Sequence, residues 1–128
     1  MKHHLSKNQH TITVSYNGEL RAEHSVEIVD EILKLISAID HTMNIIMDVS
    51  EGFSRGYIPI IKGGSLLLPH LKRFNCCYIV GDQEEKYAFA LKFFKTIGAA
   101  QQKIFFMKSI DEAREDADRR WEHYKARQ

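Results

Sequence analysis

The feature that most constrains this chain is the regular alternation of short apolar runs with longer segments of helical periodicity. The apolar runs cover residues 11–16, 44–49, 76–80 and 103–106. The first alternates with period two and the others are nearly continuous, as in strands buried on both faces. Strict alternation of strands and helices predicts an α/β fold with right-handed crossovers and a mostly parallel sheet. We expect four or five strands covered by about four helices, with Ile46, Ile79 and Ile104 buried in the sheet.

The first helix has both a start signal and a clear apolar face. Ser25 is a residue type that favours the N-cap, and Glu27 would complement the helix dipole in the first turn. The apolar residues of this segment follow the i, i+3, i+4, i+7 spacing of one buried face and are Val29, Ile32, Leu33 and Ile36. We therefore predict a helix from Ser25 to about Ile39.

Capping signals mark two later helices. Asp82 is followed three residues later by Glu85, and Ser109 by Glu112, so each pair has the pattern of a capping box. For the first of these helices the predicted inner face is Ala90, Phe93, Phe94 and Ile97, with Gly98 as the C-terminal stop. For the last helix the predicted buried stripe is Ile110, Ala113, Ala117, Trp121 and Tyr124.

The segment from residue 50 to residue 73 gives mixed signals. A helix is expected between Pro59 and Arg73, although the pair Gly63-Gly64 and Pro69 would weaken or bend it. The same glycine pair with Ser65 could form a backbone nest that binds an anion at a helix start. A glycine pair in a loop usually forms a turn, and we prefer that interpretation.

The length of 128 residues fits one domain. Residues 1–9 are polar and expected to be loose, and residues 10–128 are expected to form the single domain. Asn17-Gly18 is a turn signal, which suggests that the first strand ends in a hairpin near Leu20.

Charge and hydropathy exclude several classes of function. The chain has 18 basic and 17 acidic side chains, a balance that gives no electrostatic reason to expect nucleic-acid binding. No apolar run reaches the roughly 20 residues of a membrane-spanning helix, and the first residues lack the apolar core of a secretory signal. Cys76 and Cys77 are adjacent and should point to opposite faces of a strand, which argues against a disulfide. We therefore expect a cytoplasmic protein.

No catalytic or metal-binding pattern is found in the sequence. None of the seven histidines forms a helix-spaced pair, and there is no C-x-x-C motif or nucleophile elbow. Asp48 and Asp82 lie near strand ends, on the side of the sheet where ligands of α/β proteins bind, but a helix cap and an ordered loop explain them. We expect no metal, no cofactor and no enzymatic activity.

The order of elements and four sequence blocks resemble a known family. The blocks read NIIMDVS at 44–50, YIVGD at 78–82, FFKTIG at 93–98 and KIFFMKSIDEA at 103–113. They are similar to the STAS family of anti-sigma-factor antagonists, especially its SpoIIAA-like branch of small bacterial proteins, over about residues 10–120. The resemblance implies a SpoIIAA-like (STAS) fold and a role in protein interaction.

One family element is absent from this chain. Phospho-switched members resemble one another in a D-S-S-G-like element at the start of the second helix, where the partner kinase phosphorylates a serine. The matching region here, residues 54–59, reads SRGYIP, so Tyr57 or Ile58 occupies the position of that serine. Ser54 or Ser65 would replace it only under a different alignment. The resemblance therefore implies a member without the usual phosphoserine switch.

Large apolar residues are concentrated in the glycine-punctuated segment after the second apolar run. Two interpretations are open: these residues pack in the core under a loop, or they form an exposed hydrophobic surface that binds a partner or an apolar ligand. The candidate partner- or ligand-binding residues are Ser50, Phe53, Ser54, Tyr57, Ile58, Ser65 and Asp82.

The leading hypothesis is a non-catalytic regulatory or protein-interaction domain whose protein partner is unidentified. The alternative is a carrier of a small apolar ligand or lipid, because some SpoIIAA-like proteins resemble CRAL-TRIO domains in fold. A homodimer is compatible with both hypotheses.

Overall fold

The computed structural model describes residues 2–96 and 104–127, without the side chains of residues 94–96. The strands are β1 (Lys2–Lys7), β2 (Thr11–Glu19), β3 (Met43–Phe53), β4 (Phe74–Val80) and β5 (Ile104–Met107). The helices are α1 (Ala22–Ser37), α2 (Ile58–Leu67), the 3-10 helix η1 (Leu68–Arg73), α3 (Glu84–Thr96) and α4 (Ile110–Ala126). None of the described helices combines the length and the apolar character needed to cross a bilayer.

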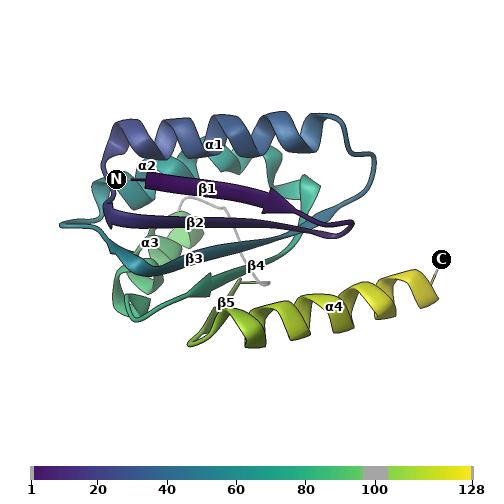
Figure 1. Cartoon of the computed structure of the whole chain (residues 1–128). Coiled ribbons are helices and arrows are strands. Elements are labelled where there is room, and N and C mark those ends of the chain that lie inside the picture. Colours follow the sequence, from purple (N-terminus) through teal and green to yellow (C-terminus); the bar gives the residue numbers. More distant parts are fainter. Residues whose placement is uncertain (1, 97–103, 128) are drawn as a thin grey trace.

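The five strands form one sheet in the order β1-β2-β3-β4-β5. β1 pairs antiparallel with β2, and every other pairing is parallel, which confirms the predicted α/β fold. The parallel strands β2 to β5 lie in the sheet in the same order as in the sequence. Because crossovers between parallel strands are right-handed, the connecting helices all lie on one face of the sheet. α1, α2 and α3 accordingly share a face, whereas α4, which follows the last strand, lies along the opposite one (Figure 1).

The N-terminal residues form a strand and are not loose as expected. Leu5 packs against the core under α1, and His3 Nε2 lies 3.0 Å from Glu31 Oε2 of that helix. The hairpin turn precedes β2, where the Asn8 side chain accepts the backbone N–H groups of His10 and Thr11, each at 2.9 Å. Asn17-Gly18 lies inside β2, so the turn predicted there was wrong. The sequence of β1 is polar because this edge strand has one neighbour and little buried surface.

α1 buries one apolar face in the core, as its periodicity predicts. Val29, Ile32 and Ile36 are buried as expected, Ile28 joins them, and Leu33 is only partly buried. The predicted start was wrong, because the helix begins at Ala22 after Arg21. Ser25 is a buried residue of the first turns, and its hydroxyl donates a hydrogen bond to the Pro59 carbonyl of α2 at 2.8 Å. This serine connects two helices and does not cap one.

Two of the remaining helix predictions are confirmed and two were wrong. Ser109 caps α4, accepting the Glu112 N–H at 3.2 Å. A helix does form between residues 58 and 73, but Gly63-Gly64 lies within α2, so the pair forms neither the turn that we preferred nor an anion nest. α3 begins at Glu84, and the Gln83 carbonyl accepts the Lys86 N–H at 3.1 Å, so Asp82 is not its N-cap. Ile97, Gly98 and Lys103 lie outside the described residues, as does the side chain of Phe94.

α4 is held on its face of the sheet by small residues and by a polar cluster. Ala113 and Ala117 pack on a core of Ile46, Cys76, Tyr78 and Val80. The Tyr78 hydroxyl donates to Asp116 Oδ2 at 2.6 Å, and Arg119 and Arg120 lie 2.8 and 2.7 Å from the same carboxylate. Further along the helix, Asp118 Oδ1 lies 2.8 Å from Nε2 of the buried His10.

Candidate functional site

An exposed group of large apolar side chains lies where β3 and β4 lead into α2 and α3. The exposed fractions are 76% for Ile58, 48% for Phe89, 44% for Phe53 and 40% for Tyr57. The rings of Tyr57 and Phe89 stack with centroids 4.2 Å apart and an interplanar angle of 20°. We call Tyr57, Ile58 and Phe89 the apolar patch, and Phe53 ends β3 at the same end of the sheet. The sequence therefore identified two of the three patch residues.

Phe89 was missed because the inner face of α3 was predicted only in part: Ala90 is buried as expected, but Phe93 is not. The residues of α3 that face the core side are Tyr87, Ala90 and Leu91, which have the i, i+3, i+4 spacing. Phe93, predicted to point inward, is 42% exposed one turn beyond Phe89. Both faces of this helix carry large apolar residues, so the periodicity alone does not choose between them.

The loop that positions Tyr57 is fixed by buried hydrogen bonds. Ser54 is fully buried and its hydroxyl donates to the Gly56 carbonyl at 2.6 Å. The Gln83 side chain bridges the loop, because its Nε2 donates to the Gly52 carbonyl at 2.5 Å and its Oε1 accepts the Ser54 N–H at 3.3 Å. Lys86 also donates to the Ser54 carbonyl. Ser54 is thus part of the support beneath the patch, and no sequence motif indicated Gln83 or Lys86.

The other three candidate residues are exposed at different places. Ser65 lies seven residues after Ile58 and so shares the exposed face of α2. Ser50 donates to Asp48 Oδ1 at 2.6 Å, beside a polar hollow lined by β1, β2 and β3. Asp82 is exposed in the turn between β4 and α3. Of the predicted site residues, only Phe53, Tyr57 and Ile58 form the exposed apolar end of the sheet.

Below the loop, a tyrosine pair links β2 to α3. The two hydroxyl oxygens of Tyr16 and Tyr87 lie 3.1 Å apart, and burial raises the pKa of both phenols, so both stay neutral. The Tyr16 ring lies directly against the backbone of Gly52, where a Cβ atom would come within 2.1 Å of a ring carbon. Glycine is therefore required at this position of β3.

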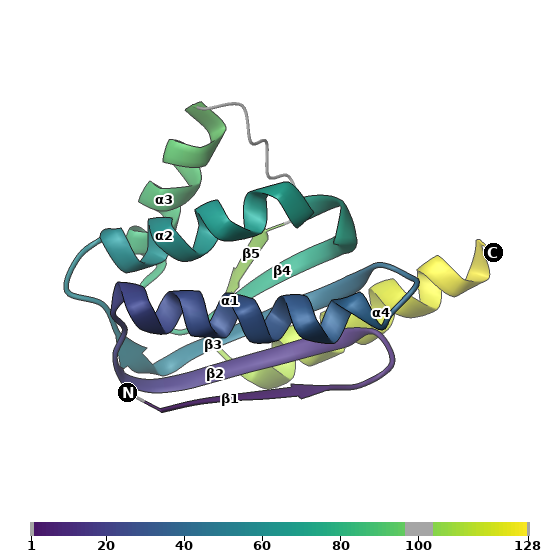
Figure 2. The ribbon, with the colours of Figure 1, turned by 90° about the horizontal axis from the view of Figure 1, so that it is seen from above.

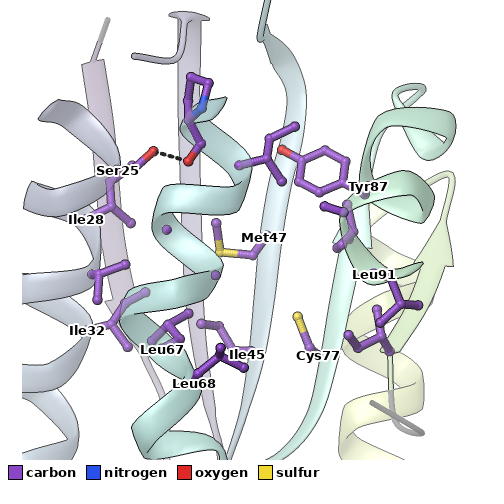
Figure 3. A pocket seen from close by; sticks show the side chains of 18 of the residues that line it. Ser25, Ile28, Ile32, Ile45, Met47, Leu67, Leu68, Cys77, Tyr87 and Leu91 are labelled. Atoms are coloured by element: carbon purple, nitrogen blue, oxygen red, sulfur yellow. Dashed lines mark hydrogen bonds between the residues drawn. The ribbon is translucent and has the colours of Figure 1, made fainter. Parts of the chain in front are cut away.

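A cavity of about 190 Å³ lies between the sheet and helices α1, α2 and α3. Figure 3 shows side chains from these helices and from β3 and β4 converging on it, among them Ile32, Met47 and Leu67. Ile79 and Ile104 also line the cavity, and they are only partly buried, whereas Ile46 on the α4 side is fully buried as predicted.

Titratable groups form no recognisable catalytic or metal-binding arrangement in the described part of the chain. No group of three or more His, Cys, Asp or Glu side chains able to hold a metal ion is found there. Neither Cys76 nor Cys77 is part of a disulfide. Burial raises the pKa of Cys77 to about 12, so this thiol is neutral and a poor nucleophile.

The comparisons with known proteins bear on the fold alone. No protein-family model and no curated protein matches the chain. An uncharacterised protein of the DUF3478 family with a SpoIIAA-like fold, from Shewanella loihica PV-4, is similar with a TM-score of 0.62 and 16% identity, covering 89% of this chain and 90% of that one. The unphosphorylated anti-sigma factor antagonist SpoIIAA is similar with a TM-score of 0.61 and 17% identity, covering 92% of this chain and 98% of that one. The chain therefore has the SpoIIAA-like fold, as its sequence blocks implied.

Proposed function

We propose that this chain is a non-catalytic regulatory module of the cytoplasm that binds a protein partner through the apolar patch. The observation that carries the proposal is the stacked pair of Tyr57 and Phe89 next to Ile58, which is 76% exposed. Clustered apolar side chains of this kind on a surface mark interaction sites, and aromatic residues dominate the binding energy of protein interfaces.

Charged residues border the patch on the loop and on α2. Arg55 precedes it with a side chain that is 82% exposed and forms an ion pair with Glu19. Lys62 is exposed one turn after Ile58. An apolar centre with a charged border is the usual composition of a protein–protein interface.

The fold supports a regulatory role through a protein partner. SpoIIAA, one of the similar structures, is an anti-sigma factor antagonist, which is a protein that acts on another protein. The similar DUF3478 structure is of an uncharacterised protein. The alternative function, carriage of an apolar ligand, draws no support from these two neighbours.

Partner binding in this chain should be independent of serine phosphorylation. α2 begins with Ile58-Pro59 after Tyr57, and none of these residues accepts phosphate from a serine kinase. The hydroxyl of Ser54 is buried and hydrogen-bonded, so a kinase would have to unfold the loop to reach it. Peptide mapping of residues 51–68 in protein from its native cells should find Ser54 and Ser65 unmodified. Stoichiometric phosphate on either serine would contradict the proposal.

The patch itself is best tested by crosslinking in the native cells. A photoreactive benzoylphenylalanine at Ile58 should give a discrete protein adduct, identifiable by mass spectrometry. The same residue at Glu122, whose side chain is 70% exposed on α4, serves as the matched control and should give none. With the partner in hand, Phe89→Ala should weaken binding at least tenfold, about 1.4 kcal/mol. Equal adducts at both positions, or none at Ile58, would contradict the proposed interface.

A further inference from the structure

The cavity lies on the inner sides of α2 and α3, whereas the apolar patch is on their outer sides. Pro59, Ile60 and Leu67 of α2 and Tyr87 and Leu91 of α3 face the cavity. α1 and α2 run side by side over the sheet, and α3 stands at an angle to them (Figure 2). Residues of all three helices and of the strands line the cavity. We propose that this cavity is a binding site for a small, uncharged, largely hydrocarbon molecule, independent of the proposed protein interface.

The size of the cavity is unusual for a packed interior. Protein cores contain few voids larger than a water molecule. This cavity, at about 190 Å³, is larger than the roughly 150 Å³ of an apolar cavity that stays dry and binds benzene. A single ring with a short alkyl chain is therefore a molecule of suitable size.

The chemistry of the lining selects against charged and polar ligands. Among the described residues that line the cavity, none has an acidic, basic or imidazole side chain. The hydroxyl of Ser25 already donates to the Pro59 carbonyl at 2.8 Å, and Tyr16 and Tyr87 are hydrogen-bonded to each other. Cys77 is held neutral by burial, which raises its pKa to about 12. A water molecule bound in the cavity needs two to four polar partners, and the hydroxyl groups of Ser25, Tyr16 and Tyr87 already have hydrogen-bond partners, so the lining offers few partners to an ordered water.

The packing of α2 indicates that apolar surface is left to be covered. Five of its ten residues are isoleucine or leucine, yet none of the residues of α2 is fully buried. Isoleucine and leucine are among the residues most often fully buried in folded proteins. A molecule in the cavity would cover the inner surfaces of Ile60 and Leu67, which otherwise face water or empty space.

The first test is a titration with n-butylbenzene, followed by NMR of isoleucine, leucine and methionine methyl groups. Saturable shifts are expected at Ile32, Met47 and Leu67, which line the cavity. The methyl groups of Ile46, under α4, and Ile58, on the patch, serve as internal controls and should not move. The charged analogue 4-butylbenzoate should bind at least tenfold more weakly, because the lining offers no counter-charge.

Two variants fill the cavity from different elements. Ala90→Leu on α3 and Cys77→Ile on β4 each add carbon atoms at lining positions, and each should weaken n-butylbenzene binding at least tenfold. Ala88→Leu is the matched control, since Ala88 is on the same helix but outside the lining. Circular dichroism verifies that each variant is folded, and Cys77→Ile provides the test if Ala90→Leu is not. Unsaturable shifts, shifts centred on Ile58, or unchanged affinity in the folded filling variants would overturn the proposal.

Discussion

The two faces of the sheet are packed in different ways. On the α4 face, two alanines bring the helix close to the sheet, and Asp116 fixes it through Tyr78 and two arginines. On the opposite face, three helices contribute long branched side chains and leave a cavity of about 190 Å³. One helix with small residues can follow the surface of a twisted sheet, whereas three helices that diverge cannot fill every space between them. The unfilled face is also the one whose helices carry the apolar patch on their outer sides.

The largest expected effect compares a buried charge on the two faces. Ile46→Asp places a carboxylate in the dry core under α4, at a cost of several kcal/mol, and should abolish cooperative thermal unfolding. Ile79→Asp places the same charge at the partly exposed cavity, where water can reach it, and should lower the melting temperature while keeping a cooperative transition. Circular dichroism melts distinguish these outcomes, with Ile46→Val as the conservative control. Equal losses would show that the cavity is as dry and closed as the core under α4.

The second comparison uses one substitution on two helices. Ala113→Leu has no space under α4 and should lower the free energy of unfolding by about 1–3 kcal/mol, as overpacked cores do. Ala90→Leu extends into the cavity, and its unfolding free energy should stay within about 1 kcal/mol of the parent protein or exceed it. Urea denaturation measures both. A greater loss for Ala90→Leu than for Ala113→Leu would reverse our description of the two faces.

A smaller effect concerns the polar attachment of α4. Burial opposes ionisation of Asp116, but hydrogen bonds from Tyr78 and Arg120 outweigh it and hold the pKa of this carboxyl below its ordinary value. A lowered folded-state pKa stabilises the protein above the unfolded-state pKa, near 4, and this stabilisation is lost as the pH falls further. Asp116→Asn should therefore cost about 1–2 kcal/mol at pH 7 and progressively less below pH 4.

The control for this prediction is Glu115→Gln, which removes an exposed carboxylate from the neighbouring position of α4. Unfolding free energies from pH 7 to pH 3 should show a pH-dependent difference from the parent protein for Asp116→Asn and almost none for Glu115→Gln. A constant cost of Asp116→Asn at every pH would mean that the side-chain shape, and not its charge, holds α4.

The features that could be predicted from the sequence depend on near neighbours in the chain. The Ser109 cap and the face of Val29, Ile32 and Ile36 follow from spacing within one helix, and the structure confirms them. Tyr57 and Ile58 were candidates because they stand among large apolar residues in a glycine-punctuated segment, for which packing under a loop and an exposed surface were both open, and the structure shows both residues exposed.

The features that were missed depend on contacts between distant segments. β1 is a strand because β2 pairs with it, and its own residues are mostly polar. Ser25 resembles an N-cap, but its actual acceptor is the Pro59 carbonyl on another helix. Phe89 joins the patch by stacking on Tyr57, and the cavity arises from the way three helices meet. Periodicity within one helix contains no information about either arrangement.

The smallest expected effect compares the starts of α4 and α1. Ser109 accepts the Glu112 N–H and Ser109→Ala should cost about 1 kcal/mol, the usual loss for an N-cap. Arg21, at the N-cap position of α1, makes no side-chain capping bond, and its exposed ion pair with Glu19 should contribute little, so Arg21→Ala should change stability by less than about 0.5 kcal/mol. Both variants are measured by urea denaturation, as the shift of the unfolding midpoint at an unchanged m-value. If Arg21→Ala lowers the free energy of unfolding as much as Ser109→Ala does, the N-terminus of α1 stabilises its helix as strongly as the Ser109 cap stabilises α4. The apolar face of α1 would then not be sufficient to fix this helix on the sheet.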